Sequence, residues 1–154
     1  MMRRFGEPPE SGRTYTLRTG AYAILPVGDG LLLTHQEAPE PEVQLPGGGV
    51  DPGESPVQAL IREVFEETGW RIARPTRLGA YRRFTYMPEY DLWAEKLCLI
   101  YMALPVVQYG DPIEPDHTAL WMSIPEAAET LANTGDRDFV LRFASRNSVF
   151  QKRG

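Results

Sequence analysis

Three glutamates, Glu63, Glu66 and Glu67, lie within five residues of one another. If this segment is an α-helix with about 100° of rotation per residue, the three side chains share an arc of about 100°. Carboxylates on one arc repel each other, so either solvent and salt or a bound cation must offset that repulsion. The pattern therefore indicates either a solvated acidic face or a site for a hard cation such as Mg²⁺, which prefers oxygen ligands.

Glycines precede this acidic segment at four positions, Gly47, Gly48, Gly49 and Gly53. A helix that its own caps define does not need them, and each glycine costs chain entropy. Glycine is favoured where the backbone turns left-handed or approaches a ligand closely. Backbone carbonyls and amides beside carboxylates could bind a cation and a phosphate. The glycines therefore favour a binding site over a solvated face.

Signals at both ends define the helix that would carry the glutamates. Ser55 is a good N-cap, Pro56 suits the first helical position, and Gln58 gives capping-box spacing. Gly69 suits a left-handed helix end. Between the caps, an apolar stripe opposite the acidic arc consists of Val57, Leu60, Ile61, Val64, Phe65 and Thr68. We predict a helix over Pro56 to Thr68 whose acidic arc is not needed for the core.

The stretch from Gly48 to Trp70 resembles the signature of the Nudix hydrolases. Gly48 is followed after five residues by Glu54, and after seven more by the run Arg62-Glu63-Val64-Phe65-Glu66-Glu67-Thr68-Gly69-Trp70. Every fixed position of the signature is matched, and Trp70 stands where the family more often has an aliphatic residue. A weaker resemblance in the order of elements extends from about Thr16 to Leu131.

This resemblance implies a fold and a reaction. The fold would be an α/β/α sandwich with a central mixed β-sheet. The reaction would be Mg²⁺- or Mn²⁺-dependent hydrolysis of a diphosphate bond in a nucleoside diphosphate linked to another moiety. Such a metal neutralises the diphosphate and polarises a water molecule, and phosphoryl chemistry needs positioning and charge stabilisation more than a protein nucleophile.

The resemblance also assigns roles to individual residues. Glu66 and Glu67 would be metal ligands, Glu63 a ligand or general base, and the Gly48 carbonyl a backbone ligand. Glu54 and Arg62 would support the loop: we favour a salt bridge from Arg62 to Glu54 or to a helix glutamate over contact with substrate.

A further carboxylate from a later loop is common in the family, several residues before a strand tryptophan. Here that tryptophan is Trp121, so Glu114 and Asp116 are candidates, and the spacing favours Glu114. The alternative is an exposed acidic loop. His117 could be a general base or a structural residue at a strand end.

Substrate contacts are predicted in an aromatic-rich segment. Arg82, Arg83 and Phe84 could stack a base and hold phosphates. An ordinary half-buried hairpin would have the same composition. The segment does not distinguish one nucleotide from another.

Composition sets the outer bounds. The 154 residues, 42% of them hydrophobic, suit one globular domain. A net charge of −5 argues against a broad nucleic-acid or membrane surface but allows a small nucleotide-type substrate. Cys98 is the only cysteine, so no internal disulfide is expected, and its apolar neighbours indicate core packing. No signal-like or membrane-spanning stretch is present, so we expect a cytoplasmic protein.

We divide the chain into a flexible arm over residues 1–13, a single domain over 14–147 and a polar tail over 148–154. Strand-like and helix-like segments alternate in a way that predicts a mixed sheet with helices packed against it. The predicted strands cover residues 15–25, 31–34, 43–46, 78–86, 93–104 and 117–122, and later helices cover 124–132 and 136–146.

Two other functions remain open. A catalytically inactive nucleotide-sensing or interaction module could have the same fold, although such modules usually lack some of the glutamates that this chain retains. An isomerase would require a reactive cysteine, which Cys98 in its apolar strand is not expected to be. A homodimer is compatible with the sequence.

Overall fold

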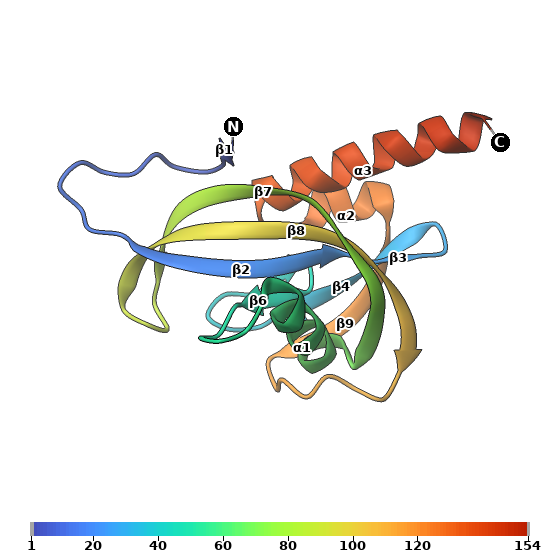
Figure 1. The fold of residues 1–154 in the computed structure, drawn as a ribbon, viewed down its shortest axis with the longest axis horizontal. Coiled ribbons are helices and arrows are strands. Elements are labelled where there is room, and N and C mark those ends of the chain that lie inside the picture. The colour runs from blue at the N-terminus through green and yellow to red at the C-terminus, as the bar shows by residue number, and fades with distance from the viewer. Residues whose placement is uncertain (1, 154) are drawn as a thin grey trace.

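The computed structural model describes residues 2–153, and the side chains of residues 2–146. Figure 1 shows a sheet with helices on both sides. The elements are β1 (Arg3–Arg4), β2 (Thr16–Ile24), β3 (Pro26–Val27), β4 (Gly30–Gln36), β5 (Glu42–Gln44), β6 (Gly47–Gly49), α1 (Pro56–Thr68), β7 (Trp70–Met87), β8 (Leu92–Gln108), β9 (His117–Ser123), α2 (Ile124–Thr130) and α3 (Thr134–Arg153).

The strands form two sheets. The larger has the order β1-β7-β8-β2-β6, and in the smaller β4 pairs with β3, β5 and β9. The larger sheet is mixed, because β2 runs parallel to β8 whereas β7 is antiparallel to β8 and β6 is antiparallel to β2. Helix α1 lies on one side of this sheet and helices α2 and α3 on the other (Figure 1). The predicted α/β/α architecture with a central mixed sheet is confirmed.

The core follows from the two-residue period of the strands. Along β2, Ala23 faces α1 and packs with Leu60, whereas Ile24 faces α2 and α3 and packs with Val140. Cys98 lies in the same buried cluster as Ile24 and Val140 and is 2% exposed. Burial raises the pKa of its thiol. Its place in the core agrees with the prediction of a packing residue.

Three elements differ from their predicted extent. β7 runs from Trp70 to Met87 as one strand with irregular register near Arg71, Ala73 and Arg77, whereas a strand was predicted only over 78–86. Arg3 and Arg4, in the predicted arm, pair with β7. Helix α3 continues to Arg153, into the predicted polar tail. The division into arm, domain and tail stays a prediction.

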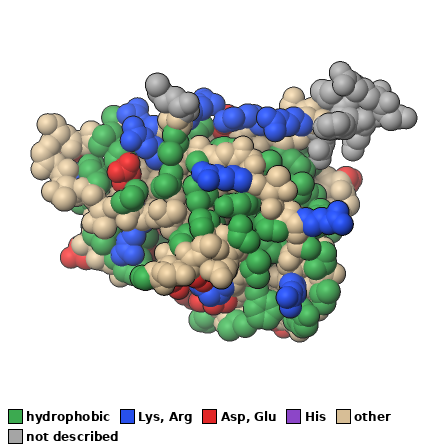
Figure 2. Space-filling model, in the orientation of Figure 1, with side chains coloured by type: hydrophobic (Ala, Val, Ile, Leu, Met, Phe, Trp, Pro, Cys, Tyr) green, Lys and Arg blue, Asp and Glu red, His purple; other side chains and the backbone are tan. Residues whose placement is uncertain are grey.

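The surface carries charges of both signs. Figure 2 shows acidic and basic side chains on the viewed face, among a larger area of hydrophobic and neutral ones. No helix in the described part of the chain is long and apolar enough to cross a membrane.

Candidate functional site

Helix α1 begins and ends where the sequence predicts. The N–H of Gln58 donates to Ser55 Oγ at 3.1 Å, and the N–H of Ser55 donates to Gln58 Oε1 at 2.8 Å, so the capping box is complete. Gly69 takes the left-handed conformation with φ 78°, and its N–H donates to the Phe65 carbonyl at 2.8 Å. These caps fix where the helix places its glutamates.

Two of the glycines before α1 allow close approaches that a side chain would block. Gly47 has φ +147°, and a Cβ there would lie 2.1 Å from the Ala21 carbonyl oxygen. A Cβ on Gly48 would lie 2.5 Å from the carboxyl carbon of Glu63. Glycine at position 48 therefore lets the Glu63 carboxylate reach the backbone of β6.

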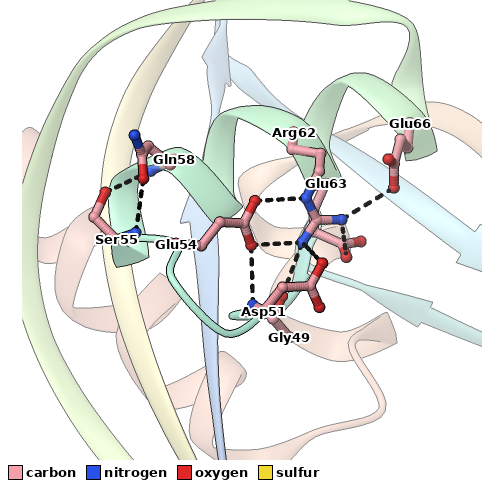
Figure 3. A network of polar contacts seen from close by, with 8 residues as sticks. All are labelled: Gly49, Asp51, Glu54, Ser55, Gln58, Arg62, Glu63 and Glu66. Carbon is pink, nitrogen blue, oxygen red and sulfur yellow. Dashed lines mark hydrogen bonds and ion pairs between the residues drawn. The ribbon is translucent and has the colours of Figure 1, made fainter.

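Arg62 connects the loop to the helix glutamates (Figure 3). Its Nε donates to Glu54 Oε2 at 2.7 Å, one terminal nitrogen lies 2.8 Å from Glu63 and 3.4 Å from Glu66, and the other donates to the Gly49 carbonyl at 3.1 Å. Hydrogen bonds from Arg62 first, and from a backbone N–H of the loop second, lower the pKa of Glu54 to about 2. This geometry suits the predicted supporting role of Glu54 and Arg62.

Glu67 is buried, and this corrects the prediction that the acidic arc lies opposite the core. The residue is 5% exposed, and its Oε1 accepts a hydrogen bond from the Gly47 N–H at 2.9 Å. Oε2 lies 3.6 Å from Nε2 of His117. Ile61, predicted to face the core, is 38% exposed. The physical reason is that α1 contacts β6 and β9 as well as the sheet, which buries a second side of the helix.

Burial and mutual repulsion disfavour the charged forms of two of these carboxylates. Burial raises the pKa of Glu67 well above its ordinary value, the Gly47 N–H opposes this, and Glu63, Glu114 and Glu66 add to it. Burial also raises the pKa of Glu63, with Arg62 opposing. A divalent cation beside them would favour the charged forms.

The acidic cluster has the oxygen donors that a hard cation needs, but not yet their convergence. Within the described residues, no three His, Cys, Asp or Glu side chains converge closely enough to hold a metal as they stand. Glu63 and Glu66 instead contact Arg62, and one oxygen of Glu67 is bonded to Gly47. The carboxylate oxygens and the nearby Gly48 backbone suit a hard cation chemically, but Glu63 and Glu66 would have to turn from Arg62 to bind one.

The loop before β9 is attached to the end of α1. The N–H groups of Ile113 and Glu114 both donate to the Glu66 carbonyl, at 2.8 and 3.0 Å. The Glu114 side chain is exposed, yet its charge contributes to the raised pKa values of Glu63 and Glu67, so it lies near the acidic cluster. Asp116, the other candidate, lines the neighbouring cleft.

His117 lies between Thr34 and Glu67. Its Nδ1 is 2.9 Å from Thr34 Oγ1, and Thr34 is fully buried on β4, beside β9. Burial lowers the pKa of His117, while Glu114 and Asp116 oppose the shift. The contact to Glu67 gives His117 a place at the cluster, and both predicted interpretations of His117 stay open. Thr34 was not predicted to belong to the site, because a threonine in an ordinary strand carries no sequence signal for such a role.

A cleft of about 1060 Å³ adjoins the glutamates. It is lined by Gly48, Glu63 and Glu67, and also by residues that the sequence analysis did not select, including Tyr22, Lys96 and Asp136. They lie on β2, β8 and α3, and a cleft formed by elements far apart in the chain has no local sequence pattern.

The three predicted substrate contacts do not share a face. Arg83 lines the cleft. Arg82 lies 3.5 Å from Glu95, beside a separate surface hollow, and Phe84 packs edge-on against Tyr15 with ring centres 4.9 Å apart. Successive strand residues point to opposite faces, so Arg83 is separated from its two neighbours.

Comparisons with known proteins agree with this fold. A family model described as the NUDIX domain matches residues 15–143. A NUDIX hydrolase structure from Nitrosomonas europaea superposes with a TM-score of 0.70 at 20% identity, covering 84% of this chain and 90% of that one. A MutT protein structure from Methanosarcina mazei gives 0.66 at 22% identity, covering 86% and 96%.

Sequence relatives match over shorter stretches. A Bacillus subtilis protein named "Putative 8-oxo-dGTP diphosphatase" is 38% identical over 74 residues, 48% of this chain and 50% of that protein. A Halorhodospira halophila protein named RNA pyrophosphohydrolase is 45% identical over 56 residues, 36% of this chain and 31% of that protein. The matched stretches therefore span half or less of these relatives.

A mixed sheet between helices, with a glycine loop and an acidic helix at one cleft, defines a class of α/β/α proteins. Within that class, the match over residues 15–143 is decisive, and the chain belongs to the NUDIX domain family.

Proposed function

We propose that this protein hydrolyses a diphosphate bond in a nucleoside diphosphate linked to another moiety, with Mg²⁺ or Mn²⁺ as cofactor. The observation that carries the proposal is the burial of the Glu67 carboxylate against the Gly47 N–H, with the charges of Glu63, Glu66 and Glu114 nearby and a cleft beside it. Buried carboxylates that repel one another are favourable only when a cation or a proton compensates them.

The proposed roles follow the contacts. Glu63, Glu66, Glu67 and the Gly48 carbonyl would hold the metal, which when bound would neutralise the diphosphate and make a water molecule more acidic. Arg62 holds Glu63 and Glu66 beside the loop until the metal competes for them. Water then adds to one phosphorus, the bond to the bridging oxygen breaks, and that oxygen leaves on the other product.

A carboxylate near the cluster is proposed to accept the proton of the attacking water. Glu63 and Glu114 are the candidates, since Glu67 is bonded through one oxygen to Gly47. Arg62 is proposed to orient Glu63 and not to contact the substrate.

One observation favours a second candidate function, that of a module without catalytic activity. Glu63 and Glu66 are paired with Arg62, and the described residues include no ready metal cluster. A catalytically inactive nucleotide-sensing or interaction module would leave those pairs intact. A cytoplasmic location and a homodimer also remain predictions from the sequence.

The experiment is a panel of nucleoside diphosphate derivatives incubated with Mg²⁺ or Mn²⁺, with products identified by mass. Because the relatives are named for them, 8-oxo-dGTP and RNA belong in the panel beside nucleotide sugars and dinucleoside polyphosphates. Cleavage that Glu67→Gln abolishes would support the hydrolase. Nucleotide binding without any cleavage would support the sensing module instead.

A further inference from the structure

Three basic side chains form a row across three neighbouring strands. Arg83 on β7 pairs directly with Lys96 on β8, and Lys96 pairs directly with Arg18 on β2. Paired residues point to the same face of a sheet, and adjacent strands lie about 4.8 Å apart, so the row spans about 10 Å. The three residues are referred to below as the basic row.

Nothing in the described part of the chain neutralises this row by direct contact. Among residues 2–146, none of the three forms an ion pair, and Nε of both Arg18 and Arg83 is buried without a hydrogen-bond partner. Like charges placed directly opposite one another on a sheet are destabilising, and buried donors without partners add to that cost. The arrangement weakens the fold unless an anion binds there.

The acids nearest Lys96 do not remove the excess charge. Burial first and the charge of Arg83 second lower the pKa of Lys96, although Cys98, Asp136 and Glu89 oppose the shift. Asp136 accepts a hydrogen bond from the Tyr81 hydroxyl at 2.7 Å. Among residues 2–146, neither Asp136 nor Glu89 forms an ion pair with the row, so its positive charges have no directly bonded counter-charge.

Two members of the row line the same cleft as the glutamates, but the row lies apart from them. Arg83 and Lys96 line the cleft together with Glu63 and Glu67. On β2, Tyr22 pairs with Gly47, and Arg18 is four residues away along the strand, or about 13 Å. This separation suits a distal part of a bound substrate and not the diphosphate beside the glutamates.

We propose that the basic row binds a phosphate group on the part of the substrate beyond the cleaved diphosphate; this substrate role rests on the proposed hydrolase function. Lys96 provides a central ammonium group, flanked by two guanidinium groups whose forked donors match phosphate oxygens. The ring of Tyr90 lies 4.5 Å from the Arg18 guanidinium carbon and holds it in place.

An NMR titration of the protein with inorganic phosphate, in the presence of EDTA, tests the site without any catalysis. Lys96→Gln and Arg83→Gln should each weaken binding about tenfold or more, because each removes a charge-assisted hydrogen bond. Arg77→Gln is the matched control: it lies on β7, is exposed and removes the same charge. Unchanged binding in all three variants, no binding to the wild type, or tighter binding of acetate than of phosphate would overturn the proposal.

Thermal melting keeps the test independent of folding. Removing one of three adjacent like charges should leave the melting temperature of Lys96→Gln unchanged or raised without phosphate, and added phosphate should stabilise the wild type more than the variant. A variant that melts lower and still gains as much from phosphate would count against the site.

Matched substrates then test the substrate role. NADP⁺ and NAD⁺ share a diphosphate and differ by one phosphate, as do coenzyme A and its 3′-dephospho form. The phosphorylated member of a cleaved pair should have the higher kcat/KM, and Lys96→Gln should remove that preference. Cleavage without preference in either pair would overturn the substrate role. Failure to cleave any member of the two pairs would also overturn the substrate role, even if the wider panel supports the hydrolase, while phosphate binding in EDTA would still decide the anion site.

Discussion

The acidic cluster borders the cleft that Arg83 and Lys96 of the basic row also line, and the two regions handle charge in opposite ways. The glutamates have partners within the chain: Arg62 contacts Glu54, Glu63 and Glu66, and the Gly47 N–H contacts Glu67. The basic row has no such contact among residues 2–146, and two of its guanidinium nitrogens are buried without partners. The acidic region is therefore organised before a ligand binds, whereas the basic row depends on a ligand for its counter-charge.

The largest expected effect comes from removing the metal. If the acidic region needs a cation for function and not only for stability, EDTA should abolish turnover, and added Mg²⁺ should restore it. Mg²⁺ should also raise the melting temperature, because it binds the folded state. Turnover that persists in a thoroughly chelated sample would mean that the partners within the chain suffice.

The next effect is that of Glu67→Gln. The glutamine oxygen can still accept the Gly47 N–H, so the fold should persist, but the charge is gone. We expect kcat to fall on the order of 10²–10³-fold, or about 3–4 kcal/mol of transition-state stabilisation.

Stability should change in the opposite direction from activity. Because the folded-state pKa of Glu67 is raised, ionisation of this side chain lowers the stability of the wild-type fold as pH rises. Glutamine does not ionise, so the variant should melt higher than the wild type at pH 8 in EDTA. Glu129→Gln, an exposed change on α2, is the control and should alter neither quantity. A fully active Glu67→Gln protein that Mg²⁺ still stabilises would exclude Glu67 as a ligand.

Asp136→Asn examines the other region. Burial raises the pKa of Asp136 to about 6, above its ordinary value of 3.8, although Tyr81, Arg83 and Lys96 oppose the shift. A raised acid pKa gives stability that is complete below about pH 4 and is lost as pH rises through 6, up to about 3 kcal/mol by pH 8. Asparagine keeps an acceptor for the Tyr81 hydroxyl and removes this loss.

The measurement is urea unfolding of both proteins at pH 5 and pH 8. The variant should gain stability relative to the wild type as pH rises. If it loses stability instead, the Asp136 charge is needed to balance the basic row, and the row is less dependent on a ligand than the comparison implies.

Local signals allowed the sequence to predict helix α1 to the residue. The cap at Ser55, the capping box with Gln58 and the stop at Gly69 depend on neighbours within a few positions. The glycines before the helix were predicted to allow a left-handed turn or close approach of a ligand, whereas the approach of Glu63 to Gly48 was seen only in the structure.

Features that depend on tertiary packing could not be predicted in this way. Burial of Glu67 follows from β6 and β9 packing beside α1, which no helical periodicity reveals. Alternation along β7 could separate Arg83 from Arg82, but not show which of them faces the cleft. Arg18, Arg83 and Lys96 come together only through strand register, which is set by the whole sheet.

The smallest expected effect is that of Glu114→Gln. The N–H of Glu114 is fixed to the Glu66 carbonyl at 3.0 Å, but its carboxylate is exposed and near Glu63 and Glu67. If it assists as a base or ligand, kcat should fall about tenfold, or about 1.4 kcal/mol. Because the side chain is exposed, stability should stay within about 0.5 kcal/mol of the wild type.

Asp116→Asn is the matched variant. Asp116 lies two residues after Glu114, carries the same charge, and its side chain lines the cleft. A loss of kcat in Asp116→Asn with a silent Glu114→Gln would assign the late carboxylate to Asp116. Equal small losses in both would mean that the loop contributes only its general negative charge, and raising the salt concentration should then reduce both losses, since screening weakens exposed charges. A loss of kcat that is confined to Glu114→Gln and insensitive to salt would add Glu114 to the acidic region. Unlike Glu63 and Glu66, which contact Arg62, Glu114 would be held there through its backbone N–H.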